Sequence, residues 1–138
     1  NSRLDELQAG LLNVRLAHME EITQERRRLA QIYSSSLHHK DITLPQERRD
    51  THSVWHQYVV RTHRRNQLIK HLADRDIGTL IHYPVPPHLS DAYKYLNYRP
   101  GDLPLTESSA DTVLSIPLYT GMKQAEQQYV IDCINAFT

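Results

Sequence analysis

The sequence is poor in cysteine, in glycine and in net charge, and each shortage excludes a class of protein. Its single cysteine, Cys133, excludes an internal disulfide framework and any metal site built from several cysteines. A lone cysteine fits a reducing compartment, so a cytoplasmic location is expected. Four glycines leave little material for a backbone loop that wraps a phosphate, and no phosphate-loop, nucleophile-elbow or dinucleotide motif occurs.

The charges balance, because 16 lysine and arginine residues stand against 16 aspartate and glutamate residues. A chain without net charge has no overall field that would attract nucleic acid or an anionic membrane. No apolar run approaches the length of a membrane span, and the first residues lack the layout of a signal peptide. We therefore expect neither nucleic acid nor a membrane as a partner.

The chain begins with Asn1, and its opening residues NSRLDELQ read as the start of a helix in mid-protein. A fragment of a longer polypeptide is therefore expected. Ser2 and Asp5 resemble a helix-capping pair, and apolar residues then recur every three or four positions as far as Tyr33. Over residues 1–37 this pattern predicts a long helix, about 50 Å if it is continuous. Such a helix is longer than a small domain needs to cover its core, so part of it should lie against something absent from this chain.

Residues 38–138 mix strand and helix patterns and are expected to form a small α+β domain. Strands are predicted over residues 54–61, 79–83 and 114–118, where β-branched, aromatic and apolar residues gather. Helices are predicted over residues 64–76, 89–96, 106–113 and 123–136. The last helix should bury Tyr129, Val130, Cys133 and Ile134.

Nine histidines invite a metal-site hypothesis. The pairs to consider are His38 with His39, His52 with His56, and His82 with His88. The second pair has a helical spacing, but it straddles the start of a predicted strand, where that spacing brings no common face. No metal site is expected.

Two polar clusters remain as candidates for function. The first, Asn1 to Arg3, lies at a predicted helix start, where free N–H groups and the helix dipole favour an anion. An ordinary helix cap is the alternative. The second, His82 and Tyr83 with His88 beyond them, ends a predicted strand and meets three prolines within four positions, which fix the backbone. An aromatic corner that fills the core is the alternative.

Four segments carry a resemblance to a known family: NSRLDELQAGLL, WHQYVVRT, GTLIHYPVPPHL and VLSIPLYTGM. In this order and with these gaps they resemble the DegT/DnrJ/StrS family of pyridoxal-phosphate-dependent nucleotide-sugar aminotransferases. Gly10, where alanine is usual, and Pro87, where leucine is common, depart from the pattern. The resemblance implies the C-terminal part of an aspartate-aminotransferase-like enzyme of fold type I. Residues 1–37 would be the long connecting helix at the domain junction, and residues 38–138 the small C-terminal domain.

By this resemblance, the intact enzyme is a homodimer with a composite active site. It would transfer an amino group, probably from glutamate, to a keto-sugar nucleotide in surface-polysaccharide, O-antigen or antibiotic biosynthesis. Asn1 would hold the phosphate of pyridoxal 5'-phosphate, and Arg3 a phosphate or the donor carboxylate. His82 and Tyr83, with His88, would help to close the site around the sugar nucleotide.

The resemblance also implies that the Schiff-base lysine would lie in an N-terminal domain, outside this chain. The four lysines present match no lysine motif of the family: Lys40, Lys70, Lys94 and Lys123. The fragment alone is therefore expected to be inactive and to contain no catalytic residue. Two other hypotheses stay open. One is a non-catalytic, self-associating interaction module. The other is nucleic-acid regulation through the arginine run 26–28, which otherwise reads as a solvated helix face.

Overall fold

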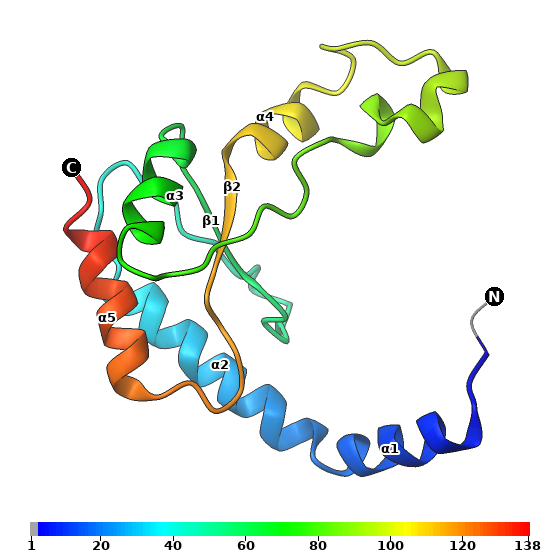
Figure 1. The fold of residues 1–138 in the computed structure, drawn as a ribbon, viewed down its shortest axis with the longest axis vertical. Coiled ribbons are helices and arrows are strands. Elements are labelled where there is room, and N and C mark those ends of the chain that lie inside the picture. Colours follow the sequence, from blue (N-terminus) through cyan, green and yellow to red (C-terminus); the bar gives the residue numbers. More distant parts are fainter. Residues whose placement is uncertain (1–2) are drawn as a thin grey trace.

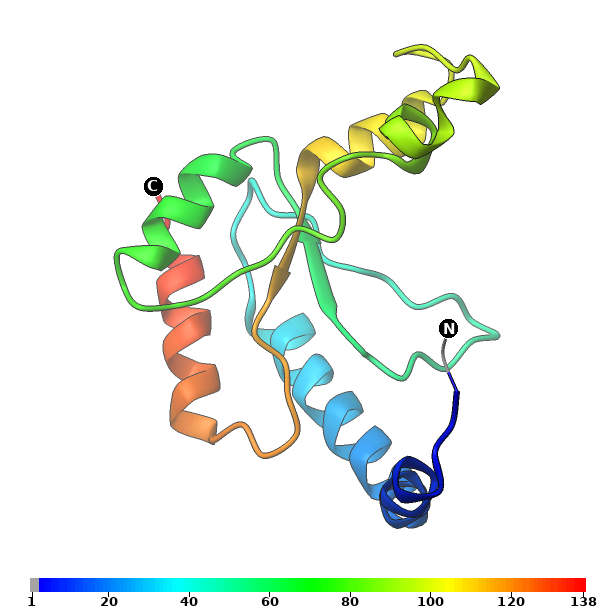
Figure 2. The same ribbon diagram turned by 45° about the vertical axis from the view of Figure 1, so that its right-hand side comes forward.

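The structure is a computed structural model, which describes residues 3–138. Its elements, with η for 3-10 helices, are α1 (Glu6–Ala17), α2 (Met19–Ser36), β1 (Tyr58–Arg61), α3 (Arg65–Ala73), η1 (Pro87–Leu89), η2 (Asp91–Leu96), α4 (Pro104–Thr112), β2 (Val113–Ile116) and α5 (Gln124–Asn135). Figures 1 and 2 show α2, α3 and α5 gathered beside β1 and β2, while η1, η2 and α4 form an arm that projects away. The expected class, α+β with a small sheet flanked by helices, is confirmed.

The sheet is antiparallel and is extended on both sides by single bridges. β1 and β2 pair along their four residues. Thr43 bridges to Arg61 on the outer side of β1, and Leu80 bridges to Ser115 on the outer side of β2. β2 therefore runs between β1 and the chain segment that follows α3.

The core lies between one face of this sheet and the helices α2, α3 and α5. Its largest fully buried apolar side chains come from all five elements: Leu29, Tyr33, Tyr58, Val60, Leu68, Leu72, Leu114, Ile131 and Ile134. Because successive strand residues point to opposite faces, Val59 and Ser115 point away from these helices. The face that carries them is called the open face below.

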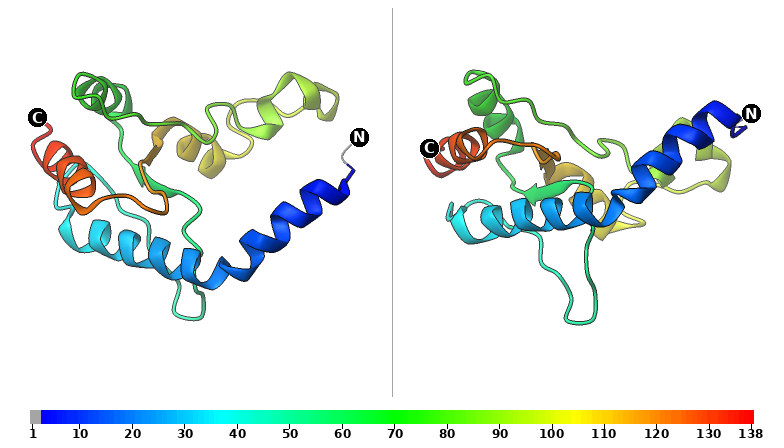
Figure 3. Two further views of the ribbon diagram at one scale, coloured as in Figure 1. Left: turned by 60° about the horizontal axis from the view of Figure 1, so that its bottom comes forward. Right: turned by 90° about the horizontal axis from the view of Figure 1, so that it is seen from below.

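The predicted long helix is two helices, so that prediction is corrected. His18 separates α1 from α2 and leaves helical geometry, with φ −105° and ψ 10°. The charges suit a junction, because Arg15 lies in the last turn of α1 and two glutamates lie in the first turn of α2. Figure 3 shows α1 leaving α2 at an angle and running away from the core.

α1 contributes nothing to the core of the described residues. It has no buried residue, whereas α2 buries Leu29, Ala30 and Tyr33. Leu7 is 76% exposed, and Leu11 and Leu16 are also exposed. The expectation that this segment packs against something outside the chain stays a prediction, as does the division into residues 1–37 and 38–138.

The strand predicted over residues 54–61 is formed only by β1, Tyr58–Arg61. Trp55 has a positive φ of 46°, which breaks the extended backbone. Nη1 of Arg26 on α2 donates to the carbonyl oxygens of Trp55 and His56, at 3.0 Å each. These carbonyls are thus bound to a helix side chain instead of a neighbouring strand.

The strand predicted over residues 79–83 is reduced to the single bridge at Leu80. Pro84 lacks the N–H group that a longer ladder would need. The helix predicted over residues 89–96 is two 3-10 helices, η1 and η2, which Ser90 separates. The strand predicted over residues 114–118 is β2, and it ends before Pro117 as a proline requires.

The last helix is confirmed, with one correction to its buried face. α5 buries Val130, Cys133 and Ile134 as expected, but Tyr129 is half exposed. Gln127 takes the inward position instead, and its Nε2 donates to the carbonyl oxygen of Leu29 at 2.8 Å. None of the helices formed by residues 3–138 is long and apolar enough to cross a membrane.

Candidate functional site

A cavity of about 510 Å³ lies beside β2, between the loop that precedes β1 and the segment that follows α3. His56, His82 and Ser115 give it polar groups, while Leu80 and Leu118 add apolar surface. A mostly apolar cavity with a few polar groups is typical of sites for organic ligands. His56 and His82 are both among the histidines that the sequence singles out.

His82 reaches this cavity because its segment alternates like a strand. Leu80 and Ser115 exchange two backbone hydrogen bonds, of 2.8 and 3.2 Å. Ile81 then packs against the core, and His82 returns to the open face. There Nδ1 of His82 lies 2.9 Å from Oγ of Ser115.

Tyr83 follows His82 and lies at the surface. It is 73% exposed, and its ring meets the His82 ring edge to face, with centroids 5.5 Å apart. The aromatic corner that fills the core is therefore wrong for Tyr83. Its phenol is accessible to a ligand or to another polypeptide.

His88 is not among the residues that line this cavity. It is buried in the arm, where its Nε2 lies 3.1 Å from Oε1 of Glu107 and its ring meets Tyr98 edge to face. The Glu107 carboxylate also accepts the backbone N–H groups of Gly101 and Leu103. These bonds, that from Gly101 first and that from His88 next, lower the pKa of Glu107. Within this chain His88 fastens η1 to α4, and its contact with a substrate stays a prediction.

The first polar cluster falls at the edge of the described residues. Asn1 lies outside them, as does Ser2. α1 begins at Glu6 with Asp5 as its N-cap, so the prediction of a helix capped by Ser2 is wrong. Aspartate is a favoured N-cap residue, although the Asp5 side chain makes no capping hydrogen bond here. Arg3 is exposed and precedes the helix, and its contact with an anion stays a prediction.

The loop before β1 is a part of the site that the sequence reasoning missed. Besides Arg26, which binds the carbonyls of Trp55 and His56, Arg27 donates through Nε to the carbonyl oxygen of Ser53 at 3.0 Å. The Trp55 ring stacks on Tyr58 at 5.4 Å. Two of the three arginines in the run 26–28 thus hold this loop, and with it His56, against α2. The sequence shows the arginine run and the aromatic segment around Trp55, but no local pattern indicates that the two meet.

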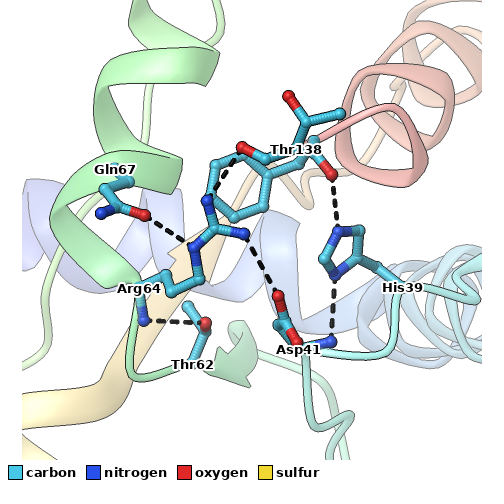
Figure 4. A network of polar contacts seen from close by, with 7 residues as sticks. His39, Asp41, Thr62, Arg64, Gln67 and Thr138 are labelled. Atoms are coloured by element: carbon cyan, nitrogen blue, oxygen red, sulfur yellow. Dashed lines mark hydrogen bonds and ion pairs between the residues drawn. The ribbon is translucent and has the colours of Figure 1, made fainter.

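A separate polar cluster around Arg64 and His39 holds the last residues against the domain (Figure 4). Arg64 donates to Asp41 at 3.2 Å and to the carbonyl oxygen of Thr138 at 2.8 Å, and its guanidinium lies 4.5 Å from the centre of the Phe137 ring. His39 accepts the N–H group of Asp41 on Nδ1, which leaves its Nε2 to donate to the carbonyl oxygen of Phe137 at 2.7 Å. These side chains form their hydrogen bonds with one another and with the backbone. We therefore interpret this cluster as a structural one and not as a ligand site. No group of metal-ligating side chains occurs within residues 3–138.

Pyridoxal phosphate, which the resemblance implies, needs a lysine in a desolvated or otherwise activating site for covalent attachment. All four lysines are exposed: Lys40, Lys70, Lys94 and Lys123. Lys94 pairs with Asp91 at 2.9 Å on the surface of the arm. The described residues therefore do not fit the attachment point of this cofactor.

Comparison with known proteins gives a consistent set of relatives. The model of the DegT/DnrJ/EryC1/StrS aminotransferase family matches residues 1–135. The chain is 43% identical to the erythromycin biosynthesis sensory transduction protein EryC1 of Saccharopolyspora erythraea, over 99% of its own length and 37% of that protein. It is 46% identical to the dTDP-3-amino-3,4,6-trideoxy-alpha-D-glucose transaminase of Streptomyces venezuelae, over 97% of its length and 36% of that enzyme.

Solved structures agree with these relatives. The structure of S. venezuelae DesV in complex with a ketimine intermediate superposes with a TM-score of 0.94 at 46% identity, over 98% of this chain and 37% of that one. A DegT DnrJ EryC1 StrS aminotransferase from Brucella abortus gives a TM-score of 0.90 at 34% identity, over 99% of this chain and 36% of that one. The chain thus spans little more than a third of the length of these relatives.

Proposed function

The chain belongs to the DegT/DnrJ/EryC1/StrS aminotransferase family, and on that premise we propose that it is the C-terminal part of a nucleotide-sugar aminotransferase. The intact enzyme transfers an amino group from glutamate to a keto-sugar nucleotide. Transaminases of dTDP-sugars and of a UDP-sugar among the relatives support this substrate class. Surface-polysaccharide, O-antigen or antibiotic biosynthesis would use the product. The single cysteine supports a cytoplasmic enzyme.

The observation that carries the proposal is the position of His82. It stands on the open face of the sheet at a cavity of about 510 Å³, with the exposed ring of Tyr83 beside it. We propose that these two rings line the sugar-nucleotide side of the active site. The prolines that follow them hold the backbone, so the rings keep their direction.

The cofactor and the reactive lysine belong to the rest of the enzyme in this proposal. Pyridoxal phosphate, when bound, supplies the electron sink that transamination requires. The residues of this chain bind the substrates and the cofactor phosphate and orient them. Asn1 and Arg3 are assigned to the cofactor phosphate and to an anionic group of the donor, by the family resemblance. His88 acts by holding the arm in shape, through Glu107.

Assembly is the remaining part of the proposal. α1 exposes Leu7, Leu11, Leu12, Val14 and Leu16, and Leu4 just before it is exposed as well. So many large apolar side chains left exposed on one helix indicate an interaction site. We assign it to packing within a homodimer and against the N-terminal part of the enzyme. The same surface favours the second candidate, a self-associating module without catalysis.

Half-reactions of the full-length enzyme test the role of His82. His82→Ala and Tyr83→Phe should slow the sugar-nucleotide half-reaction, by about tenfold or more for His82→Ala, the effect of one lost hydrogen bond. The glutamate half-reaction should stay within about twofold of the wild type. Single-turnover absorbance of the cofactor measures both. His63→Ala, an exposed histidine between β1 and α3, is the matched control. Equal losses in the two half-reactions would refute the assignment.

A further inference from the structure

Ser115 is a polar residue in an otherwise apolar strand. The sequence of β2 is Val-Leu-Ser-Ile, and the neighbours of Ser115 in this strand, Leu114 and Ile116, are in the core. Ser115 points to the open face and is only 7% exposed, and its Oγ lies 2.9 Å from Nδ1 of His82. A buried hydroxyl is destabilising unless it has a hydrogen-bond partner.

The backbone fixes the position of this hydroxyl on both sides. Ser115 lies opposite Val59 of β1 and exchanges two backbone hydrogen bonds with Leu80. His82, two residues after Leu80, is the diagonal neighbour of Ser115 on the same face, which is within reach of a long side chain. The 2.9 Å contact between Oγ of Ser115 and Nδ1 of His82 follows from this register.

The direction of the hydrogen bond follows from the partners available. Within residues 3–138 the Ser115 hydroxyl has no hydrogen-bond partner other than His82. If Nδ1 donated its proton to Oγ, the hydroxyl hydrogen would have no acceptor within residues 3–138. A buried unpaired donor costs more than an oxygen lone pair left free. This favours a hydroxyl that donates to Nδ1, with the ring proton of neutral His82 on Nε2.

We propose that Ser115 is a positioning residue for His82, which it holds by Nδ1 so that the Nε2–H group donates to an oxygen acceptor of a ligand in the adjoining cavity. Hydroxyl, carbonyl and phosphate oxygens all fit this donor. The identification of that ligand as a sugar nucleotide rests on the proposed function. The hydrogen bond and the tautomer do not depend on it.

Spectroscopy of the full-length protein tests the geometry by itself. Nitrogen chemical shifts of the His82 ring, assigned by their loss in His82→Gln, should show the Nε2–H tautomer in the wild type. Ser115→Ala should give a mixture of tautomers, and Ser115→Thr should restore the single tautomer because it keeps the hydroxyl on a β-branched residue suited to a strand. Ser34→Ala, which removes a hydroxyl that contacts Tyr58, is the matched control. A His82 tautomer unchanged by Ser115→Ala would overturn the proposal.

Kinetics then test the consequence. Ser115→Ala should slow the sugar-nucleotide half-reaction about tenfold, equal to about 1.4 kcal/mol, with Ser115→Thr within about threefold of the wild type. In a His82→Ala background, Ser115→Ala should add less than about twofold, because its effect acts through the ring. A full loss in that background would show that Ser115 acts only on the fold, which overturns the proposal. If His82→Ala itself leaves the sugar half-reaction intact while the tautomer still responds to Ser115, the proposed function fails and the positioning role stands.

Discussion

Glu107 joins three segments of the projecting arm through one carboxylate. It accepts N–H groups from the turn at Gly101 and from Leu103, and it binds Nε2 of the buried His88. Each of these donors stabilises the ionised carboxylate, and together they lower its pKa. The packing of η1 against α4 therefore includes one ionisable residue.

Glu107→Gln should remove a pH-dependent part of the stability of the arm. A carboxyl whose pKa is lower in the folded state stabilises that state at pH values above its ordinary pKa of 4.5. This contribution disappears as the pH falls through the pKa of the folded state. The wild type should therefore lose thermal stability more steeply than Glu107→Gln does as the pH falls from neutral to below 4.5. Melting temperatures across this range provide the measurement.

Asp50→Asn, in the exposed loop before β1, is the matched control and should melt with the pH dependence of the wild type. Parallel melting curves for Glu107→Gln and the wild type would show that the bonds of this carboxylate do not contribute to stability.

At the scale of elements, α2 is joined to the chain around β2 by a tyrosine. The Tyr33 hydroxyl donates to the carbonyl oxygen of Pro117 at 2.7 Å, and the ring packs against Tyr58 with centroids 5.1 Å apart. Burial raises the pKa of Tyr33, since the phenolate would lose its hydration. The hydrogen bond fixes the point at which the chain leaves the sheet, which is beside the cavity that His82 lines.

Tyr33→Phe should lower the free energy of unfolding by about 1–2 kcal/mol, because it leaves the Pro117 carbonyl without its partner inside the protein. Urea titration followed by circular dichroism measures this change. Tyr119→Phe removes an exposed hydroxyl that contacts Glu126 and should cost only a few tenths of a kcal/mol. Equal effects of the two substitutions would mean that the Tyr33 hydrogen bond contributes no more to the free energy of unfolding than the exposed one does.

At the scale of the whole molecule, the features on which the proposed function rests lie on the outside of the domain. The His82 cavity lies on the open face of the sheet, the four lysines are exposed, and α1 extends from the core with its apolar side chains uncovered. In the proposed enzyme, a site of this kind is completed by parts outside this chain. Both the proposed chemistry and the proposed homodimer depend on them.

The 138-residue chain mixed with pyridoxal phosphate should therefore give no turnover of a keto-sugar nucleotide with glutamate. After borohydride reduction, any label should be spread over the exposed lysines, because none has a desolvated site that would favour attachment. Peptide mapping by mass spectrometry measures the distribution. One dominant labelled lysine, together with turnover, would place the catalytic centre in this chain. Size-exclusion chromatography of the same sample would show whether the chain self-associates.

The sequence by itself determined the class of fold, the family and most of the elements. Apolar periodicity and strand composition are local properties, so they located α3, α4, α5, β1 and β2 to within a few residues. The proline after β2 ended the strand where local backbone chemistry requires. The family resemblance rested on segments of continuous sequence, and the match over residues 1–135 confirms it.

The tertiary structure alone decided the length of β1, the break at His18 and the partners of the candidate residues. Trp55 leaves the strand because Arg26, 29 residues earlier, binds its carbonyl oxygen. His82 and Ser115 meet across 33 residues because Leu80 bridges to β2. Hydrogen bonds between distant segments depend on how the elements pack, and no local pattern in the chain encodes that packing.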